Sequence, residues 1–575
     1  MIHLPNIYGA GAGFGFSGLE GPAGLADDFV GLLTGDRIGV CFEFPGGHQT
    51  LAFELEPGVR EIEYKLVVND TVDAQLTKGG ENGRLVFMMT EHKALAGYAR
   101  FAKPVVIASS AYRQYARDDC VVTEGPDAAT ALYVEAGAFT FAYDPVSADA
   151  AIARAKSAVK ADLDALMAKR LSFYYALPPC PAADNAIERA YYKAFSILKH
   201  NVQTAEGGIK GLWTTPDRLP HRNMWLWDSC FHSVGLRYIG EELAARAVEA
   251  VLEQQHEDGF IPHMMTPTGC SDITQPPLLA WALELCYRRT GDKSLVERNL
   301  PKLRAYLEWN LRNRDINGNL LCEWAIEGDP RCRSGESGMD NSQRFDEAAT
   351  LDAVDFSCFM KNEYDCLARL EDELGYPDES ARSREKADAI GSAINKFLWN
   401  DKLGIYADRK MDGGISDVAA ISGFLPLWAG VATAERAERL RLLLVDPLAF
   451  NTPMPLPSAS ASDPEYSTDM WRGGVWMNYL YMVVNGLRRY GMNELAANIS
   501  AMAVNNMTRW YMQCGSLYEY YHAENILPPQ MLDRKGPTTP PVDIRRKIFC
   551  IADYGWTAAV FIALLHENET CHDGI

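Results

Sequence analysis

The chain has 575 residues, a hydrophobic content of 47% and a formal net charge of -21 at pH 7. Its length exceeds that of one ordinary domain, so we expect two or three compact units with large cores. Nucleic acids and anionic membranes need a clustered positive surface, and the acidic balance argues against both as partners. A neutral polyol needs no such field, so a small-molecule carbohydrate partner is compatible with this charge.

The cysteines and the start of the chain bear on its compartment. The 13 cysteines include no Cys-x-x-Cys pair. This pattern favours reduced thiols over a disulfide framework or a zinc site. No basic run precedes a long apolar stretch at the amino terminus, and no segment approaches the roughly 18 apolar residues of a membrane span. We therefore predict a cytoplasmic protein without a membrane segment or a cofactor, and we assign no residue as a metal ligand.

The first 148 residues have the pattern of a β domain. Short runs at 37–44, 50–55, 61–68, 84–89 and 131–142 are separated by Gly, Pro, Asn and Asp, and several of them alternate apolar and polar residues. Short strands at such spacing are typical of a sandwich of two sheets. We predict an amino-terminal β-sandwich domain over 1–148.

The pattern becomes helical after this region. Residues 149–170 are predicted to form one helix within a linker over 149–180, and residues 181–575 to form a helical domain. Its predicted helices span 184–204, 227–239, 241–256, 276–291, 294–312, 351–374, 378–398, 418–429, 432–443, 472–491, 493–511 and 552–567. The chain is therefore predicted to be mostly α. Periodicity alone leaves open a closed toroid of six inner and six outer helices and an open solenoid.

Six motifs in the helical region occur in an order that resembles glycoside hydrolase family 63. They are WLWDSCFH at 225–232, QHEDGFIPH at 255–263, TQPP at 274–277, ESGMDNSQRFD at 336–346, WRGGVW at 471–476 and EYY at 519–521. The resemblance covers roughly residues 180–570. It implies an (α/α)6 barrel catalytic domain and hydrolysis with inversion. Relatives of that family include trehalases and the mannosylglycerate and glucosylglycerate hydrolases.

The same resemblance implies that Asp340 is the general acid and Glu519 the general base. An inverting hydrolase needs one protonated carboxylic acid at the leaving oxygen and one carboxylate that activates water on the opposite face of the sugar. Their carboxyl groups are then expected about 6.5 to 9.5 Å apart. Without the resemblance, Asp340 also fits a helix cap or an Asx-turn, and Glu524 competes with Glu519 for the role of base.

Further polar and aromatic residues in the motifs are predicted to bind the sugar. An indole covers the apolar face of a sugar ring, while carboxylate, amide and guanidinium groups bind its hydroxyls. The predicted contacts are Trp225, Trp227, Asp228, Gln275, Trp471, Arg472, Trp476 and Tyr521. The alternatives are that the tryptophans are core residues, that Gln275 only begins a helix, and that Arg472 forms a structural ion pair.

We predict an inverting, exo-acting α-glucosidase that acts on a small oligosaccharide or glucosyl conjugate. The alternatives are a trehalase-like or mannosyl- or glucosylglycerate hydrolase, a sugar 2-epimerase and a non-catalytic sugar-binding protein. The Pro-rich interval 528–542 is a candidate rim or lid of the pocket. The sequence leaves open the oligomeric state and whether a structural calcium ion is bound.

Overall fold

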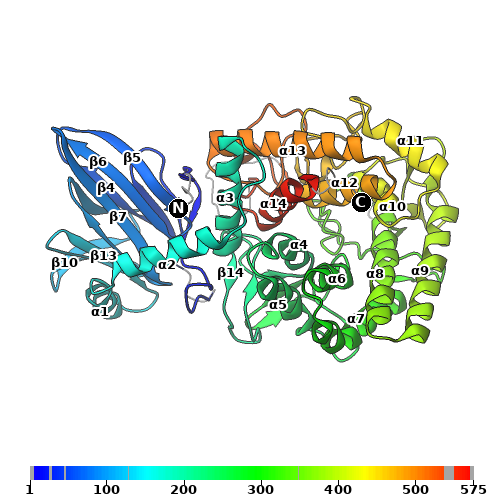
Figure 1. The fold of residues 1–575 in the computed structure, drawn as a ribbon, viewed down its shortest axis with the longest axis horizontal. Helices are drawn as coiled ribbons and strands as arrows, with labels where there is room; N and C mark the ends of the chain where they lie inside the picture. The colour runs from blue at the N-terminus through cyan, green and yellow to red at the C-terminus, as the bar shows by residue number, and fades with distance from the viewer. Residues whose placement is uncertain are drawn as a thin grey trace. The chain divides into compact units, whose positions relative to one another are not determined.

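A computed structural model describes residues 6–24, 29–44, 47–126, 128–347, 349–536 and 549–569 (Figure 1). The chain forms two compact units, each made of several segments. The β-rich unit comprises Met1–Glu206, Asp217–Arg222 and Thr508–Leu517. The helical unit comprises Gly207–Pro216, Asn223–Met507 and Tyr518–Ile575. Every predicted site residue belongs to the helical unit.

Two antiparallel sheets form the body of the β-rich unit. Their strands are β1 (Gly13–Phe14), β2 (Gly31–Leu33), β3 (Gly39–Phe44), β4 (Gly47–Leu55), β5 (Val59–Val68), β6 (Thr71–Lys78), β7 (Glu81–Glu91), β8 (Ala94–Ala99), β9 (Ala102–Ala108), β10 (Arg113–Arg117), β11 (Cys120–Glu124), β12 (Ala129–Glu135) and β13 (Ala138–Asp144). One sheet has the order β1-β2-β3-β4-β9 and the other β10-β11-β12-β13-β8-β7-β6-β5. Aromatic side chains of both sheets, including Phe42, Phe53, Phe87 and Phe141, share one buried core. The predicted sheet-rich amino-terminal region is confirmed.

Two sequence predictions in this unit need correction. The run 131–142 is not one strand, because β12 and β13 form a hairpin that turns at Ala136 and Gly137, where φ is 50° and 87°. The helix predicted over 149–170 is two helices, α1 (Ala148–Ala158) and α2 (Leu163–Ala176). Each begins with a side-chain cap, from Ser147 and Asp162, and such a second cap starts a new helix.

All twelve helices predicted after residue 181 have counterparts among the described residues. They are α3 (Asn185–His200), α4 (Leu226–Leu236), α5 (Glu241–Leu252), α6 (Leu279–Thr290), α7 (Lys293–Arg314), α8 (Val354–Glu373), α9 (Pro377–Phe397), α10 (Leu425–Trp428), α11 (Ala434–Leu444), α12 (Met477–Arg489), α13 (Asn493–Cys514) and α14 (Gly555–Glu569). The helix predicted over 418–429 is shorter than expected, since a 3-10 turn over Ile421–Phe424 precedes α10.

Alternate helices of this series form a closed ring. Helices α4, α6, α8, α10, α12 and α14 contact one another in that order, and α14 packs against α4 (Figure 1). Helices α5, α7 and α9 pack against members of this ring. A solenoid would leave its first and last helices apart, so the closed arrangement is the correct one of the two predicted. The chain as a whole is mixed, with a sheet-rich and a helical part, and the prediction of a mostly α chain is only partly confirmed.

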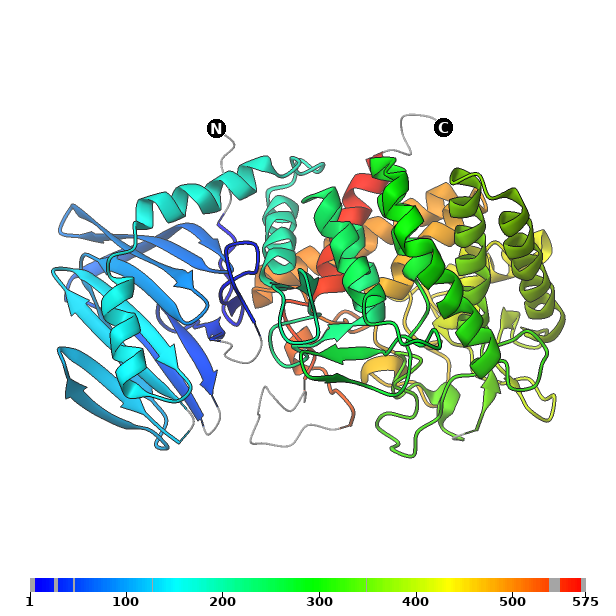
Figure 2. The ribbon, with the colours of Figure 1, turned by 90° about the horizontal axis from the view of Figure 1, so that it is seen from below.

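Short strands and long loops gather near the amino-terminal ends of the ring helices. They include β15 (Trp213–Thr214), β16 (Met224–Trp225), β17 (Met264–Thr266), β18 (Gly269–Cys270), β19 (Leu351–Asp352), β20 (Trp399–Asn400), β21 (Ile405–Tyr406) and β22 (Arg409–Lys410). Strand β14 (Val202–Gln203) belongs to the β-rich unit. In Figure 2 the green strands among them lie at the lower end of the helices, and α14, in red, rises to the upper end. The six motifs fall in these loops or in the first turns of the helices that follow.

Two further properties concern the described part of the chain. None of its helices combines the length and the apolar character that a membrane crossing requires. Within the same residues, no cluster of three or more His, Cys, Asp and Glu side chains has the arrangement of a metal site.

Candidate active site

Asp340 lies in a tightly turned loop before the 3-10 turn Gln343–Phe345. Ser337 shapes this loop, because its hydroxyl donates to the Ser334 carbonyl (2.8 Å) and accepts the N–H of Met339 (3.0 Å). Gly338 has a φ of +70°, and a β-carbon there would lie 2.3 Å from the ring of Trp227. Only glycine allows both this left-handed conformation and this close approach to the indole.

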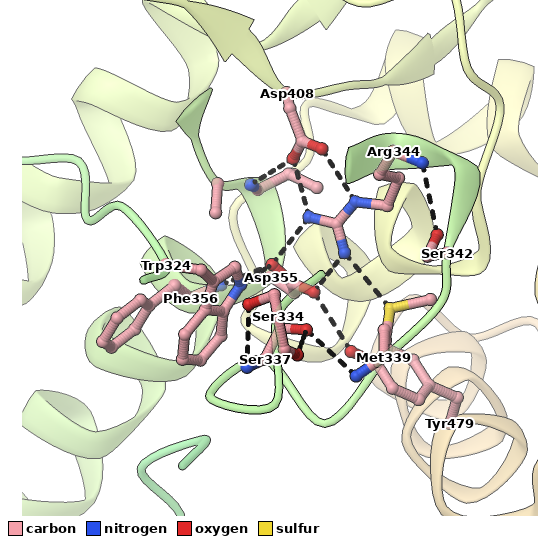
Figure 3. Close-up of polar contacts among 12 residues, drawn as sticks. Trp324, Ser334, Ser337, Met339, Ser342, Arg344, Asp355, Phe356, Asp408 and Tyr479 are labelled. Atoms are coloured by element: carbon pink, nitrogen blue, oxygen red, sulfur yellow. Dashed lines mark hydrogen bonds and ion pairs between the residues drawn. The ribbon is translucent and has the colours of Figure 1, made fainter. Parts of the chain in front are cut away.

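A buried charge network fixes the loop to the ring helices (Figure 3). The Arg344 guanidinium contacts the carboxylate of Asp355, in the first turn of α8, at 2.5 Å and that of Asp408 at 2.7 Å. The Asp355 carboxylate also accepts hydrogen bonds from Tyr479 (3.1 Å) and Trp324 (2.9 Å). Burial would raise the pKa of Asp355, but the Arg344 charge holds this pKa below its usual value. Breaking these contacts would leave a buried charge unpaired, which is energetically costly. Arg344 therefore holds the loop in one conformation.

Glu336, the other carboxylate of the motif, is part of the scaffold. Its side chain is fully buried and pairs with Arg314, with a shortest distance of 2.7 Å. It also accepts the backbone N–H groups of Thr274 (3.1 Å) and Ala325 (2.7 Å). These bonds occupy both carboxylate oxygens, so Glu336 ties three loops together.

The Asp340 carboxylate, in contrast, retains an exposed surface of 19%. Its Oδ2 lies 2.7 Å from Nζ of Lys535. Burial lowers the pKa of Lys535, but the charge of Asp340 more than reverses this and leaves the pKa raised. The Cys332 thiol also hydrogen-bonds to Asp340, and burial together with the carboxylate charge raises the pKa of Cys332 to about 12. Lys535 therefore stabilises the ionised form of Asp340 in this state.

Glu519 is almost completely buried and forms a two-pronged ion pair with Arg534. Arg534 Nε lies 2.9 Å from Glu519 Oε2, and its Nη2 lies 3.0 Å from Oε1. Burial lowers the pKa of Arg534, but the nearby carboxylates of Glu519 and then Asp340 raise it above its usual value. The backbone at Glu519 is fixed as well, because its carbonyl accepts the indole N–H of Trp556 (3.2 Å).

Consecutive residues of one segment thus bind both candidate catalytic carboxylates. This segment, 528–536, belongs to the interval predicted as a rim or lid, of which 537–542 lie outside the described residues. The Asp469 carboxylate accepts the backbone N–H groups of Lys535 (2.9 Å) and Gly536 (2.8 Å), and burial raises the pKa of Asp469. The Tyr520 hydroxyl donates to the Asp533 carbonyl. We call this segment the cationic strap, after Arg534 and Lys535.

Aromatic rings lie next to the two carboxylate-bearing segments. Trp471 and Trp476 stack with ring centroids 3.8 Å apart, and Trp476 also stacks on Tyr520 at 4.7 Å. Trp227 packs edge-to-face on Trp556 at 5.3 Å. All five side chains are at most 3% exposed. In this state they form a buried aromatic cluster beside the two segments, and the predicted sugar-stacking face of Trp471 is covered by Trp476.

Three more predicted contacts lie around the start of α4. Trp225 is the half-buried residue before the helix and packs edge-to-face on His263. Asp228 lies buried in the first turn. The Gln275 side-chain oxygen accepts the backbone N–H of Trp227 (3.2 Å), which supplies a cap that no residue of α4 provides itself. Gln275 therefore acts as a helix cap here.

Arg472 and Tyr521 are engaged with other protein groups. Arg472 makes a two-pronged ion pair with Asp346, at 2.8 and 2.9 Å. The Tyr521 hydroxyl accepts the backbone N–H of Tyr518 (3.1 Å). The Tyr521 contact helps to position the 518–521 segment. Arg472 contacts the Asp340 loop at Asp346 and so helps to position the 341–346 segment.

Sequence reasoning missed the cations of the site and the residues that hold them. Arg534, Lys535, Asp469, Cys332 and Trp556 were not among the predicted site residues. The only available signal was a pair of adjacent cations inside the Pro-rich interval, because nothing in a sequence tells which distant carboxylate such a pair meets. Glu524, the alternative base, is exposed, whereas Glu519 is buried at the site.

Comparisons with known proteins concern mainly the helical part of the chain. Residues 221–525 match the family model of the mannosylglycerate hydrolase MGH1-like glycoside hydrolase domain. Mannosylglycerate hydrolase MGH1 of Selaginella moellendorffii is 26% identical over 395 residues, which cover 54% of this chain and 78% of that protein. The mannosylglycerate hydrolase of Thermus thermophilus is 23% identical over 401 residues, which cover 55% and 92%.

Two solved structures show the same fold. The family 63 mannosylglycerate hydrolase of Thermus thermophilus in complex with Tris superposes with a TM-score of 0.54 at 23% identity, over 66% of this chain and all of that one. A bacterial glucoamylase complexed with acarbose gives a TM-score of 0.54 at 12% identity, over 98% of this chain and 89% of that one. The first likeness thus covers two thirds of this chain and the second nearly all of it.

Proposed function

The chain belongs to the mannosylglycerate hydrolase MGH1-like glycoside hydrolase domain family and is therefore a glycoside hydrolase, and we propose that its substrate is a small glycosyl conjugate of glycerate. The relatives named above are mannosylglycerate hydrolases, which favours this alternative over the α-glucosidase predicted first. We further propose that the ring helices and the helices outside them make up an (α/α)6 barrel. The cytoplasmic location and the absence of a cofactor stay predictions.

We assign Asp340 as the general acid and Glu519 as the general base of an inverting reaction. Asp340 would protonate the glycosidic oxygen, and Glu519 would take a proton from the water that attacks the opposite face of the sugar. Asp340 keeps an exposed surface on a rigid loop, as an acid that must meet its substrate requires. The expected separation of about 6.5 to 9.5 Å between their carboxyl groups stays a prediction.

One observation supports a charged leaving group: both carboxylates are ion-paired with the cationic strap. Asp340 cannot hold the proton that an acid needs while Lys535 stabilises its charge. Arg534 contacts both oxygens of Glu519, so the attacking water must reach one of the remaining lone pairs of that carboxylate. A substrate whose leaving group carries a carboxylate offers Lys535 another anionic partner, and binding then releases Asp340 for protonation. A neutral leaving group offers no such exchange.

The experiment is a substrate comparison with anomer-resolved proton NMR. The panel contains α-mannosylglycerate, α-glucosylglycerate, trehalose and maltose, with the two glycerate conjugates expected to react fastest. Inversion of an α-linkage predicts that the β-anomer of the free sugar appears first. A first-formed α-anomer would contradict the proposed mechanism, and faster hydrolysis of maltose would return the assignment to an α-glucosidase. An epimerised free sugar, or binding without turnover, would favour the two non-hydrolytic alternatives.

A further inference from the structure

A cavity lies among the ring helices, toward the ends opposite the candidate active site. Its volume is about 400 Å³, which is enough for a hexose derivative. Five of the ring helices line it, α6, α8, α10, α12 and α14. Most of the lining residues, including Arg288, Arg489 and Glu567, lie toward the carboxyl-terminal ends of these helices, whereas Trp281 comes from the first turn of α6. The candidate catalytic residues lie in loops at the amino-terminal ends, the lower end in Figure 2. None of the residues assigned to catalysis or sugar binding lines this cavity.

Aromatic rings form one wall of the cavity. Trp281 packs edge-to-face on Trp428, with centroids 6.0 Å apart, and lies 6.5 Å from Tyr481. Within the described residues, no acceptor meets the indole N–H of Trp281 or Trp428, and neither nitrogen is among the buried atoms without a partner. Both nitrogens therefore keep some exposed surface, on side chains that line the cavity. Since indole N–H groups in protein interiors usually have an acceptor, these two are suited to a ligand oxygen.

The charges around the cavity are unbalanced toward the positive. Each of three carboxylates is shared by two cations: Glu284 by Arg288 and Arg369, Glu567 by Arg237 and Arg488, and Asp365 by Lys361 and Arg489. Cations thus outnumber carboxylates here, although the chain as a whole carries a net charge of -21. A local positive field in an acidic protein attracts anions to this place.

Arg489 is the least neutralised of these cations. Its Nη2 is 4.0 Å from Asp365, which also binds Lys361. Its Nη1 donates to the Trp428 carbonyl (3.0 Å), which holds the guanidinium beside the aromatic wall. The side chain is 44% exposed. A guanidinium held in this way presents its remaining donors in the planar fork that binds phosphate or carboxylate.

We propose that this cavity is a second ligand site, for a small saccharide that carries a phosphate or carboxylate group. The aromatic wall contacts the apolar face of the sugar, and the two indole N–H groups and the Asn362 amide bind its hydroxyls. Arg489 binds the anionic group. The combination requires both parts of the ligand, because the aromatic wall alone gives little affinity for a neutral sugar and the half-exposed guanidinium little for a bare anion.

The test is calorimetric titration of the full chain with glucose 6-phosphate, glucuronate, glucose and inorganic phosphate. We expect glucose 6-phosphate or glucuronate, or both, to bind at least about tenfold more tightly than glucose or phosphate. Comparison of the first two probes shows which anionic group the site takes. Equal affinity for glucose and for its charged derivatives, or no saturable binding of either charged probe, would overturn the proposal.

Variants locate the binding. Arg489→Gln is expected to weaken the charged probe at least about tenfold, and Trp428→Phe to weaken it about threefold while preserving the ring packing. Arg472→Gln, an arginine at the other end of the helices, is the matched control and is expected to leave this binding unchanged. Loss of binding in Arg472→Gln with retention in Arg489→Gln would place the ligand at the candidate active site and refute the second site. Circular dichroism of each variant checks folding, and Trp428→Phe provides the test if Arg489→Gln does not fold.

Discussion

The two candidate catalytic carboxylates differ in what holds them. Asp340 lies on a loop whose rigidity comes from Arg344, Ser337 and Glu336, through contacts with groups other than the Asp340 carboxylate. Glu519 is itself one half of a buried, two-pronged ion pair with Arg534. Asp340 can therefore be replaced with little structural cost, whereas Glu519 has a structural and a chemical role together.

Replacement of Asp340 is expected to have the largest effect on activity. Asp340→Asn removes the proton donor, and we expect kcat/KM for the best substrate to fall about a thousandfold or more. Steady-state kinetics measures this loss, and urea unfolding is expected to show a change of no more than about 1 kcal/mol, because the pair with Lys535 is partly exposed. Asp329→Asn, at an exposed carboxylate of the preceding loop, is the control. Near-normal turnover in Asp340→Asn would remove it as the acid.

Replacement of Glu519 should lower activity and stability together. Glu519→Gln leaves the buried Arg534 without its counter-charge, so the free energy of unfolding is expected to fall by about 3 kcal/mol. Urea unfolding measures this change, and added azide is expected to restore part of the activity by replacing the activated water. Glu524→Gln, at the exposed neighbour, is expected to stay within about 0.5 kcal/mol of the parent. A severe loss of activity in Glu524→Gln alone would transfer the role of base to Glu524.

A third carboxylate, that of Glu363, is buried and forms no ion pair within the described residues. Glu363 of α8 accepts the backbone N–H groups of Ala280 (2.7 Å) and Trp281 (2.8 Å), and burial raises its pKa to about 7. The folded state then binds the proton more tightly, so this stabilisation is complete below the unfolded pKa near 4.5 and is lost as the pH rises through about 7.

Glu363→Gln should flatten this dependence. Between pH 5 and 8, the unfolding free energy of the parent is expected to fall by about 2 kcal/mol more than that of the variant, because glutamine does not titrate. Urea unfolding across this pH range provides the measurement, with Glu385→Gln on the exposed face of α9 as the control. Parallel profiles for parent and Glu363→Gln would contradict the assigned shift.

Replacement of Lys535 sharpens the comparison at the acid. Lys535→Met removes the cation beside Asp340, so kcat/KM for a glycerate conjugate, which loses its anion contact, is expected to fall about tenfold. The kcat/KM for a substrate with a neutral leaving group is expected to rise, because Asp340 is then free to hold its proton. The protonated acid should also persist to higher pH, which moves the alkaline side of the rate profile upward. Lys402→Met, at an exposed lysine, is the control. Equal losses on both substrates would argue against an anionic leaving group.

The sequence predicted the individual helices and strands well, but it did not predict that the helices close into a ring. Helical periodicity predicted all the helices of the ring, because an amphipathic helix repeats its apolar residues every three or four positions. The same reasoning merged α1 with α2 and joined β12 to β13, because the cap at Asp162 and the turn at Ala136 and Gly137 are short signals inside longer patterns. The contact of α14 with α4 joins residues more than 300 positions apart. Helical periodicity describes only neighbouring residues, so it cannot reveal a contact between such distant helices.

The family resemblance, the helix series and the two carboxylate candidates can be read from the amino-acid sequence, because motifs and amphipathic faces are local properties. How these parts meet can be read only from the folded chain. It separated Glu336, which is a scaffold residue, from Asp340, four positions later, and it separated the buried Glu519 from the exposed Glu524. It also joined Arg534 and Lys535 to the two carboxylates. The physical reason is that burial and ion pairing depend on what surrounds a side chain in space, and distant segments supply those surroundings.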